Sequence, residues 1–271
     1  MTSAVTPEVD AVAQAAARLG RAARERRPAP PVRDLLGTRD VRAAYAVQRE
    51  LNHGREAAGG VVVGRKIGLT SAAVQRQLGV DQPDFGVLFA DMDVSGGPEI
   101  SADSLLQPRV EAEVAFWLSR GLADGPLDDA QVRAAVGYAV AALEIVDSRV
   151  ADWDIAITDT IADNGSSGLF VLADRRLTLD EFEPRAVRMR MYVDDELASE
   201  GSGAACLGDP LHALGWLART AREFGEPLQA GQIVLSGALG PMVATGPGTR
   251  VRAEIGALGQ VTATFATDIG A

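Results

Sequence analysis

Period-two alternation of apolar and polar residues marks several stretches after residue 60 as β-strands. The strands that this pattern and β-rich composition predict lie at residues 61–70, 109–118, 143–148, 168–173, 186–195, 232–239, 250–258 and 260–266. Only a few helical stretches separate them. The pattern therefore predicts an α+β protein whose body is a mixed, curled β-sheet rather than a doubly wound parallel sheet.

Apolar residues recur at helical spacing in five other stretches. The helices predicted from this spacing lie at residues 6–26, 38–56, 72–78, 128–141 and 209–225. The proline-rich segment RRPAPPV separates the first two, which offer each other little apolar surface. We therefore expect residues 1–60 to form an N-terminal helical arm, packed on a main domain of residues 61–271.

Two like charges stand within one predicted strand, RVEAEVAFW, at Glu111 and Glu113. Because strand side chains alternate between faces, both carboxylates point the same way. A third acid, Glu144, lies in the apolar run of residues 140–146, where a lone carboxylate is costly. Together the three would make an all-oxygen site suited to Mg²⁺ or Mn²⁺. The alternative is that the pair on residues 109–118 lies on the solvated face of an edge strand.

Other polar residues carry weaker signals. Lys66 stands between two glycines in GRKIGLTS and can serve a buried anion, although a strand-end lysine in solvent has the same pattern. Asp84 lies in the proline-stiffened turn VDQPDFG, where aspartate can cap the turn or act as a base. The loop DNGSSG at 163–168 offers amide and hydroxyl donors, and the turn GALGPM at 237–242 has backbone that could line a pocket.

Composition narrows the classes of function. Hydrophobic residues make up 47% of the 271 residues and charged residues 23%, ordinary values for a globular enzyme. The net charge of −11 argues against nucleic acid or an anionic membrane as partner. No apolar run approaches the roughly 20 residues of a membrane span, and the N-terminus lacks a signal-peptide pattern, so we expect a cytoplasmic location. The single cysteine, Cys206, excludes an internal disulfide.

Taken together, the segments resemble a known enzyme family. The matching segments are VGRKIGLTSAAVQRQLGVDQPDFGVLFADM, LQPRVEAEVAFWL, ALEIVDSRVADW, DTIADNGSSG, CLGDPLHALGWLA and SGALGPMVA. They resemble the 2-keto-4-pentenoate (2-hydroxypentadienoate) hydratases of the fumarylacetoacetate hydrolase superfamily, in order and in spacing, from about residue 30 to 266. One departure is Gly165, where the family usually has alanine.

The resemblance implies a fumarylacetoacetase C-terminal-like body that adds water to 2-hydroxypenta-2,4-dienoate, giving 4-hydroxy-2-oxopentanoate. It also implies a homo-oligomer built on pentamers, with a small molecule as its substrate. The resemblance implies that Glu111, Glu113 and Glu144 bind a divalent metal ion. It implies that Lys66 and Asp84 transfer protons, and that Asn164 and Ser166 contact the substrate.

Three other functions stay open at this point. A 4-oxalocrotonate decarboxylase would use the same metal, but it needs a second cationic spot, for which we consider Arg65 and Arg109 in the matched segments. Hydrolysis of a C–C bond usually needs a histidine to activate water, whereas His53 and His212 fall within predicted helices. A non-catalytic subunit is disfavoured by the intact acid set with Lys66.

Overall fold

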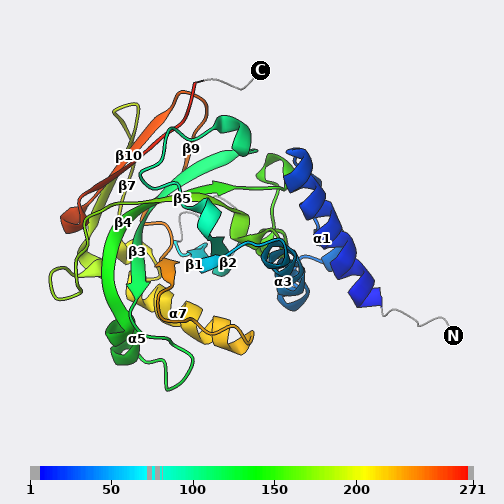
Figure 1. The fold of residues 1–271 in the computed structure, drawn as a ribbon, viewed down its shortest axis with the longest axis horizontal. Coiled ribbons are helices and arrows are strands. Elements are labelled where there is room, and N and C mark those ends of the chain that lie inside the picture. Colours follow the sequence, from blue (N-terminus) through cyan, green and yellow to red (C-terminus); the bar gives the residue numbers. More distant parts are fainter. Residues whose placement is uncertain (1–6, 72–74, 77–79, 81, 268–271) are drawn as a thin grey trace.

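The computed structural model describes residues 7–71, 75–76, 80 and 82–267. Within these residues, two β-sheets build the body of the molecule, and a group of helices lies beside them (Figure 1). The predicted α+β architecture with a mixed, curled sheet and N-terminal helices is confirmed. Among the described residues, no helix combines the length and apolarity that crossing a membrane requires.

The larger sheet carries seven strands in the order β2-β1-β8-β3-β4-β5, with β9 paired to β3. Its strands are β1 (Val62–Gly68), β2 (Asp84–Phe89), β3 (Pro108–Leu118), β4 (Val136–Asp147), β5 (Ser167–Leu172), β8 (Ile233–Leu235) and β9 (Val243–Ala244). Strands β1 and β8 are parallel, whereas the other pairs are antiparallel, so the sheet is mixed. The long strand β3 lies in its middle, with β8 on one side and β4 on the other.

The smaller sheet is antiparallel, with the order β11-β10-β6-β7. Its strands are β6 (Arg188–Val193), β7 (Glu196–Ser202), β10 (Arg250–Ile255) and β11 (Gln260–Thr264). Val114 and Phe116 of β3 belong to the same buried core as Val251 and Ala253 of β10. One face of β3 therefore packs into the main core, which leaves the opposite face for the acidic residues.

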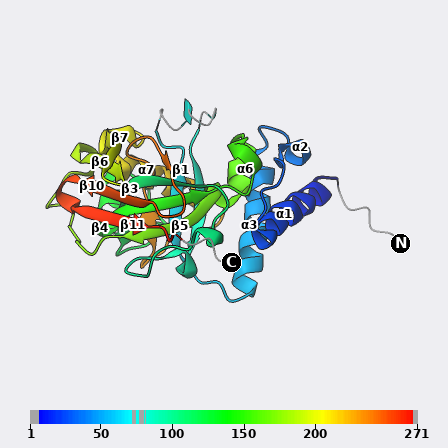
Figure 2. The ribbon, with the colours of Figure 1, turned by 90° about the horizontal axis from the view of Figure 1, so that it is seen from above.

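Most of the α-helices lie together beside the sheets. The helices are α1 (Pro7–Glu25), α2 (Arg33–Leu36), α3 (Val41–Ala57), α5 (Asp129–Ala135), α6 (Ile157–Ala162) and α7 (Pro210–Glu223). Short 3₁₀ turns are η1 (Ala90–Met92), η2 (Ala102–Ser104), η3 (Ala151–Trp153), η4 (Asn164–Ser166), η5 (Pro184–Ala186), η6 (Gly203–Ala205) and η7 (Gly256–Leu258). Seen from above, α1, α2, α3 and α6 form one group beside the sheets (Figure 2).

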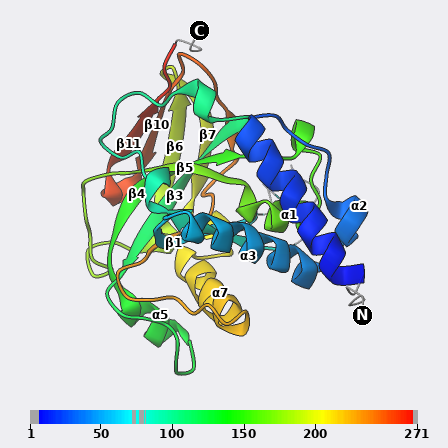
Figure 3. The same ribbon diagram turned by 45° about the vertical axis from the view of Figure 1, so that its right-hand side comes forward.

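Helix α3 joins the N-terminal segment to the body, and α1 crosses it on the outside (Figure 3). Gln48 of α3 is buried and donates hydrogen bonds to the carbonyl oxygens of Phe85 and Ile161, both at 2.8 Å. The buried carboxylate of Asp159 accepts hydrogen bonds from the backbone N–H groups of Val32 and Arg33. The division into an arm of residues 1–60 and a metal-binding catalytic domain of residues 61–271 stays a proposal.

Some predicted boundaries were wrong. The helix predicted at residues 128–141 ends at Ala135, because the following residues form β4, which pairs with β3 along its length. Strand β4 is buried on both faces, so it lacks the alternation that identifies a half-exposed strand. The helix predicted from residue 38 begins at Val41, where the Asp40 carboxylate caps it by accepting from Ala43 N–H. The short helix predicted at 72–78 lies, apart from residues 75 and 76, outside the described residues.

Candidate functional site

Three glutamates meet on one face of the larger sheet. Glu111 of β3 pairs directly with Glu144 of β4, and Glu113 follows two residues later on the same face. One carboxylate oxygen from each lies within 4.8 Å of the others. Because β3 is a central strand and the three residues are at most 5% exposed, the solvated edge-strand interpretation of Glu111 and Glu113 is wrong.

Burial makes the negative charge of this cluster unfavourable. Burial first, and the neighbouring Glu144 second, raise the pKa of Glu111 to about 8. The same two causes hold the pKa of Glu113 well above its ordinary value. Burial also raises the pKa of Glu144, although Lys66 works against this shift. The cluster therefore has a strong electrostatic demand for a positive charge between its carboxylates.

The donor set fits a hard divalent cation. Glu113 Oε2 accepts a hydrogen bond from Gly237 N–H at 2.7 Å, so the 237–242 turn supports the cluster through its backbone. Glu113 Oε1 and Glu144 Oε2 are buried and have no hydrogen-bond partner among the described residues. Buried oxygens without a partner are costly unless a ligand satisfies them. Three carboxylates that offer oxygens at close range match the ligands that Mg²⁺ and Mn²⁺ prefer.

Lys66 provides the cation nearest to this cluster. Lys66 is 2% exposed, so the interpretation of Lys66 as a strand-end lysine in solvent is wrong. Its Nζ lies 3.1 Å from Glu144 Oε1. Burial works to lower the pKa of Lys66, yet Glu144 and the other nearby acids together raise it above its ordinary value. A Cβ at Gly165 would lie 2.9 Å from Lys66 Cε, so a glycine there leaves room for the lysine side chain.

Asp84 is the first residue of β2 and not part of a surface turn, which corrects the prediction for VDQPDFG. It pairs with Gly68 of β1 and is 1% exposed. Thr160 Oγ1 of α6 donates a hydrogen bond to Asp84 Oδ2 at 2.9 Å. Burial raises the pKa of Asp84, whereas Lys66 and Thr160 oppose the shift. A Cβ at Gly68 would lie 2.1 Å from Asp84 Oδ1 and 3.4 Å from Lys66 Nζ, so both groups occupy the space beside this glycine.

The 163–168 loop forms a left-handed turn against β2. Asn164, Gly165 and Ser166 have φ values of 56°, 62° and 53°, a conformation that is costly outside glycine. The Asn164 side chain donates to Val87 O at 2.9 Å and accepts from Val87 N–H at 2.8 Å. Asn164 Oδ1 also accepts from Asn52 of α3. Its amide thus holds the turn to the sheet, while Ser166 Oγ lies 3.5 Å from Asp163 Oδ2.

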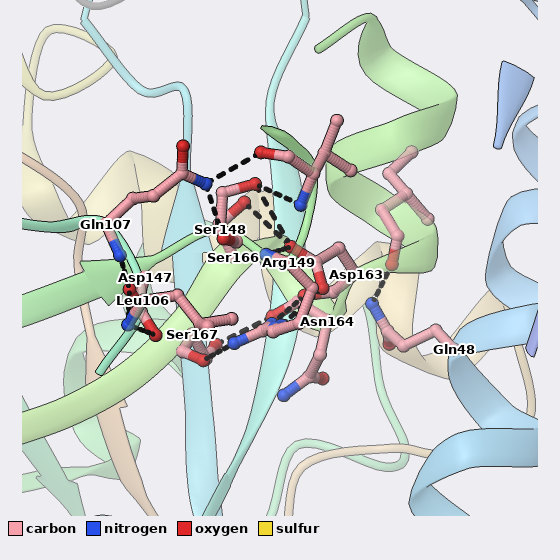
Figure 4. A network of polar contacts seen from close by, with 12 residues as sticks. Gln48, Leu106, Gln107, Asp147, Ser148, Arg149, Asp163, Asn164, Ser166 and Ser167 are labelled. Atoms are coloured by element: carbon pink, nitrogen blue, oxygen red, sulfur yellow. Dashed lines mark hydrogen bonds and ion pairs between the residues drawn. The ribbon is translucent and has the colours of Figure 1, made fainter. Parts of the chain in front are cut away.

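Arg149 clamps this turn from the other side, within the polar network of Figure 4. Its Nη1 donates to Ser167 O at 2.7 Å, and its backbone N–H donates to Asp163 Oδ2 at 2.9 Å. Its Nε and Nη2 donate to the carboxylate and to the carbonyl of Asp163, respectively. One guanidinium therefore fixes both ends of the left-handed turn.

The structure thus brings Lys66, Asp84 and the three glutamates into one buried neighbourhood and places Asn164 and Ser166 on the adjoining turn. The sequence pattern gave no role to the supporting residues Gln48, Asn52, Arg149 and Thr160. The segments that hold Asp163 and Gly237 were among the candidates, although these two residues were not singled out. Thr160 and Asp163 stand in the segment DTIADNGSSG, whose density of polar side chains before a strand was the available signal.

Comparisons with known proteins show the family to which the chain belongs. The profile of the fumarylacetoacetate (FAA) hydrolase C-terminal family matches residues 62–266. The TodF product hydratase of Pseudomonas putida F1 is 51% identical over 98% of this chain and 99% of its own. The 2-keto-4-pentenoate hydratase 2 of Dechloromonas aromatica is 52% identical over 93% of this chain and 96% of its own.

A solved structure extends the likeness to three dimensions. The 4-oxalocrotonate decarboxylase of Pseudomonas putida G7, complexed with magnesium and adipate, superposes with a TM-score of 0.89 at 30% identity. The alignment covers 97% of this chain and 100% of the decarboxylase chain. The chain therefore belongs to the fumarylacetoacetate hydrolase family, in the group that contains the 2-keto-4-pentenoate hydratases.

Proposed function

We propose that this protein is a divalent-metal-dependent hydratase that converts 2-hydroxypenta-2,4-dienoate into 4-hydroxy-2-oxopentanoate in the catabolism of aromatic compounds. The observation that carries the proposal is the buried set of Glu111, Glu113 and Glu144 beside Lys66. About half of all residues are identical to those of relatives named as hydratases of this type, over nearly the whole chain, which supports the substrate class.

In this proposal the three glutamates hold one Mg²⁺ or Mn²⁺ ion. When bound, the ion would supply a Lewis acid that stabilises negative charge on the oxygen atoms of the substrate. The magnesium in the related decarboxylase structure supports a divalent ion, and the all-oxygen donor set favours Mg²⁺ or Mn²⁺ over zinc.

The chain's own residues would then move the protons. The enol O–H of the substrate gives up a proton and C5 gains one, which yields an α,β-unsaturated ketone. Water next adds its oxygen to C4, and C3 takes the remaining proton. We assign these transfers to Lys66 and Asp84, which are buried side by side and whose protonation is shifted by their surroundings. The turn at 164–166 would line the substrate pocket next to them.

A second candidate is the decarboxylation of 4-oxalocrotonate. The close superposition with the decarboxylase favours it, because the same metal centre could stabilise an enolate after CO₂ loss. The higher identity to the hydratases favours hydration instead.

Product analysis separates the two. Purified protein with Mg²⁺ or Mn²⁺ is incubated with 2-hydroxypenta-2,4-dienoate and, in parallel, with 4-oxalocrotonate, and the products are identified by ¹H NMR. We expect 4-hydroxy-2-oxopentanoate from the first and, from the second, none of the 2-hydroxypenta-2,4-dienoate that loss of CO₂ would produce. Glu113→Gln should be inactive, whereas Glu196→Gln, a change on the exposed part of β7, should leave turnover intact. An unchanged dienoate alongside release of CO₂ from 4-oxalocrotonate would establish the decarboxylase instead.

We also propose that the active form is a homo-oligomer built on pentamers, a proposal that rests on the family resemblance. Light scattering coupled to size-exclusion chromatography measures the molar mass directly. A mass equal to five or ten times the 28.3 kDa of one chain is expected, and a monomer would contradict the proposal.

A further inference from the structure

A cavity lies on the face of β1 and β2 opposite to the face that carries Lys66 and Asp84. Its volume is about 400 Å³, and it is bounded by α3, by β1 and β2, and by the segment of residues 224–232. We call it the Arg65 pocket; the residues that define it here are Tyr45, Arg49, Arg65, Phe85, Phe224 and Glu226. Because neighbouring strand residues point to opposite faces, Arg65 enters this pocket while Lys66 faces the acidic centre.

The charge of Arg65 is incompletely compensated. The residue is 7% exposed, and its Nε is buried with no hydrogen-bond partner among the described residues. Its Nη1 donates to Gly64 O at 3.1 Å, and its Nη2 reaches Glu226 Oε2 at 3.2 Å. Burial lowers the pKa of the guanidinium, and Glu226 and Glu56 offset the shift only in part.

Glu226 forms ion pairs with two arginines, Arg65 and Arg49. Its other oxygen lies 3.2 Å from Arg49 Nε, and its side chain is 35% exposed. Two arginines thus share the half-exposed carboxylate of Glu226, while Glu56, the other acid of the lining, acts on Arg65 only through its longer-range charge. A carboxylate from solution would add a second negative charge where the two guanidinium groups converge.

The pocket also has an aromatic wall. The Tyr45 ring stacks on Phe85 with their centroids 4.5 Å apart, and Phe224 lies 4.4 Å from Tyr45. Aromatic side chains beside arginine favour a ligand that joins a flat apolar body to an anionic group.

We propose that the Arg65 pocket binds a small aromatic carboxylate, with its carboxylate between Arg49 and Arg65 and its ring against Tyr45, Phe85 and Phe224. The ligand would contact Arg65 and Phe85, the sequence neighbours of Lys66 and Asp84. Occupancy would therefore act on the strands that position the acid–base pair, without competing for the metal centre.

Calorimetric titration of the metal-free protein with sodium benzoate at constant ionic strength tests the proposal. Working without metal removes carboxylate binding at the acidic centre, so the result does not depend on the proposed hydratase function. Arg49→Met should weaken the affinity about fivefold, because it removes one cation at the rim. Glu226→Gln should strengthen it by a similar factor, because it removes the resident competitor. Arg42→Met, an exposed change on the same helix outside the pocket, is the matched control.

Saturable binding that shifts in opposite directions in the two variants, with acetate binding more weakly than benzoate, supports the site. The absence of saturation, or an affinity that either variant leaves unchanged, overturns it. Acetate binding as tightly as benzoate would also overturn it, because the aromatic wall would then contribute nothing.

Discussion

Glu111 and Glu113 indicate a candidate metal site, and in the absence of a metal ion they destabilise the folded protein. A like-charged pair on one face of a central strand destabilises the sheet through desolvation and repulsion. Such a pair is consistent with a requirement for a ligand of opposite charge. The glutamates became candidates because their charge conflicts with the apolar pattern around them, whereas Lys66 was assigned a role only through the family resemblance.

Replacing Glu111 with glutamine should separate metal binding from folding. The change removes a buried carboxyl group whose ionisation is unfavourable in the metal-free protein, so the free energy of unfolding of that form should stay the same or rise, while affinity for Mn²⁺ should fall strongly. Urea titration and Mn²⁺ binding measure the two effects. Wild-type Mn²⁺ affinity in Glu111→Gln would mean that this carboxylate is not a ligand.

Lys66 and Asp84 should act in the chemical step and not in holding the ion. Lys66→Met and Asp84→Asn are therefore expected to bind Mn²⁺ with near-normal affinity and to lose about 10²–10⁴-fold in kcat, the usual contribution of an acid–base group. Steady-state kinetics at saturating metal provides the measurement. A variant that keeps near-normal kcat would remove that residue from the proposed mechanism.

Cys206 should be chemically silent in the folded protein. It is fully buried, its Sγ donates to Ser236 O at 2.9 Å, and burial raises the pKa of its thiol to about 12. Since the thiolate is the reactive form, a disulfide reagent should label it only on unfolding. Rapid labelling of the native protein would show that the region around β8 opens readily.

At the scale of elements, the left-handed turn at 164–166 depends on its clamp. Arg149→Met would leave the buried Asp163 charge without its partner, which should lower the free energy of unfolding by about 3–5 kcal/mol. Urea unfolding measures this loss, with Arg175→Met as an exposed control. Because the proposed metal ligands lie on β3 and β4, Mn²⁺ affinity should change less than kcat does. If Mn²⁺ affinity and kcat fell by the same factor, the turn would not act specifically on the positions of Lys66 and Asp84.

Elements with regular patterns were predictable, and elements defined by tertiary contacts were not. Strand β3 was found because alternation and apolar content agree there. Strand β4 was partly mistaken for helix, because its alanine-rich start at 136–142 has good helix propensity that pairing with β3 overrides. Asp84 was assigned to a turn because Pro83 precedes it, although that proline stands just before the first residue of β2. Contacts such as Thr160 with Asp84 join residues far apart in the chain and have no local signal.

At the scale of the whole molecule, the site unites segments that only the complete fold brings together. The proposed ligands come from β3 and β4, Lys66 and Asp84 come from β1 and β2, and α3 supports the turn at 164–166 through Asn52. A ligand that binds only the folded state stabilises the whole molecule, by about 2.7 kcal/mol at one hundred times its dissociation constant. Metal binding and global stability should therefore be linked.

The most direct measurement is a titration of metal-free protein with Mn²⁺, followed by electron paramagnetic resonance, which distinguishes bound from free ion. We expect one tightly bound Mn²⁺ per chain, displaced by Mg²⁺, with turnover of the dienoate rising in proportion to occupancy. Glu113→Gln should lose the tight site and the turnover together, while Glu196→Gln should keep both. Full turnover in protein that binds no Mn²⁺ or Mg²⁺, or an unchanged tight site in Glu113→Gln, would contradict the assignment of the three glutamates as the metal centre.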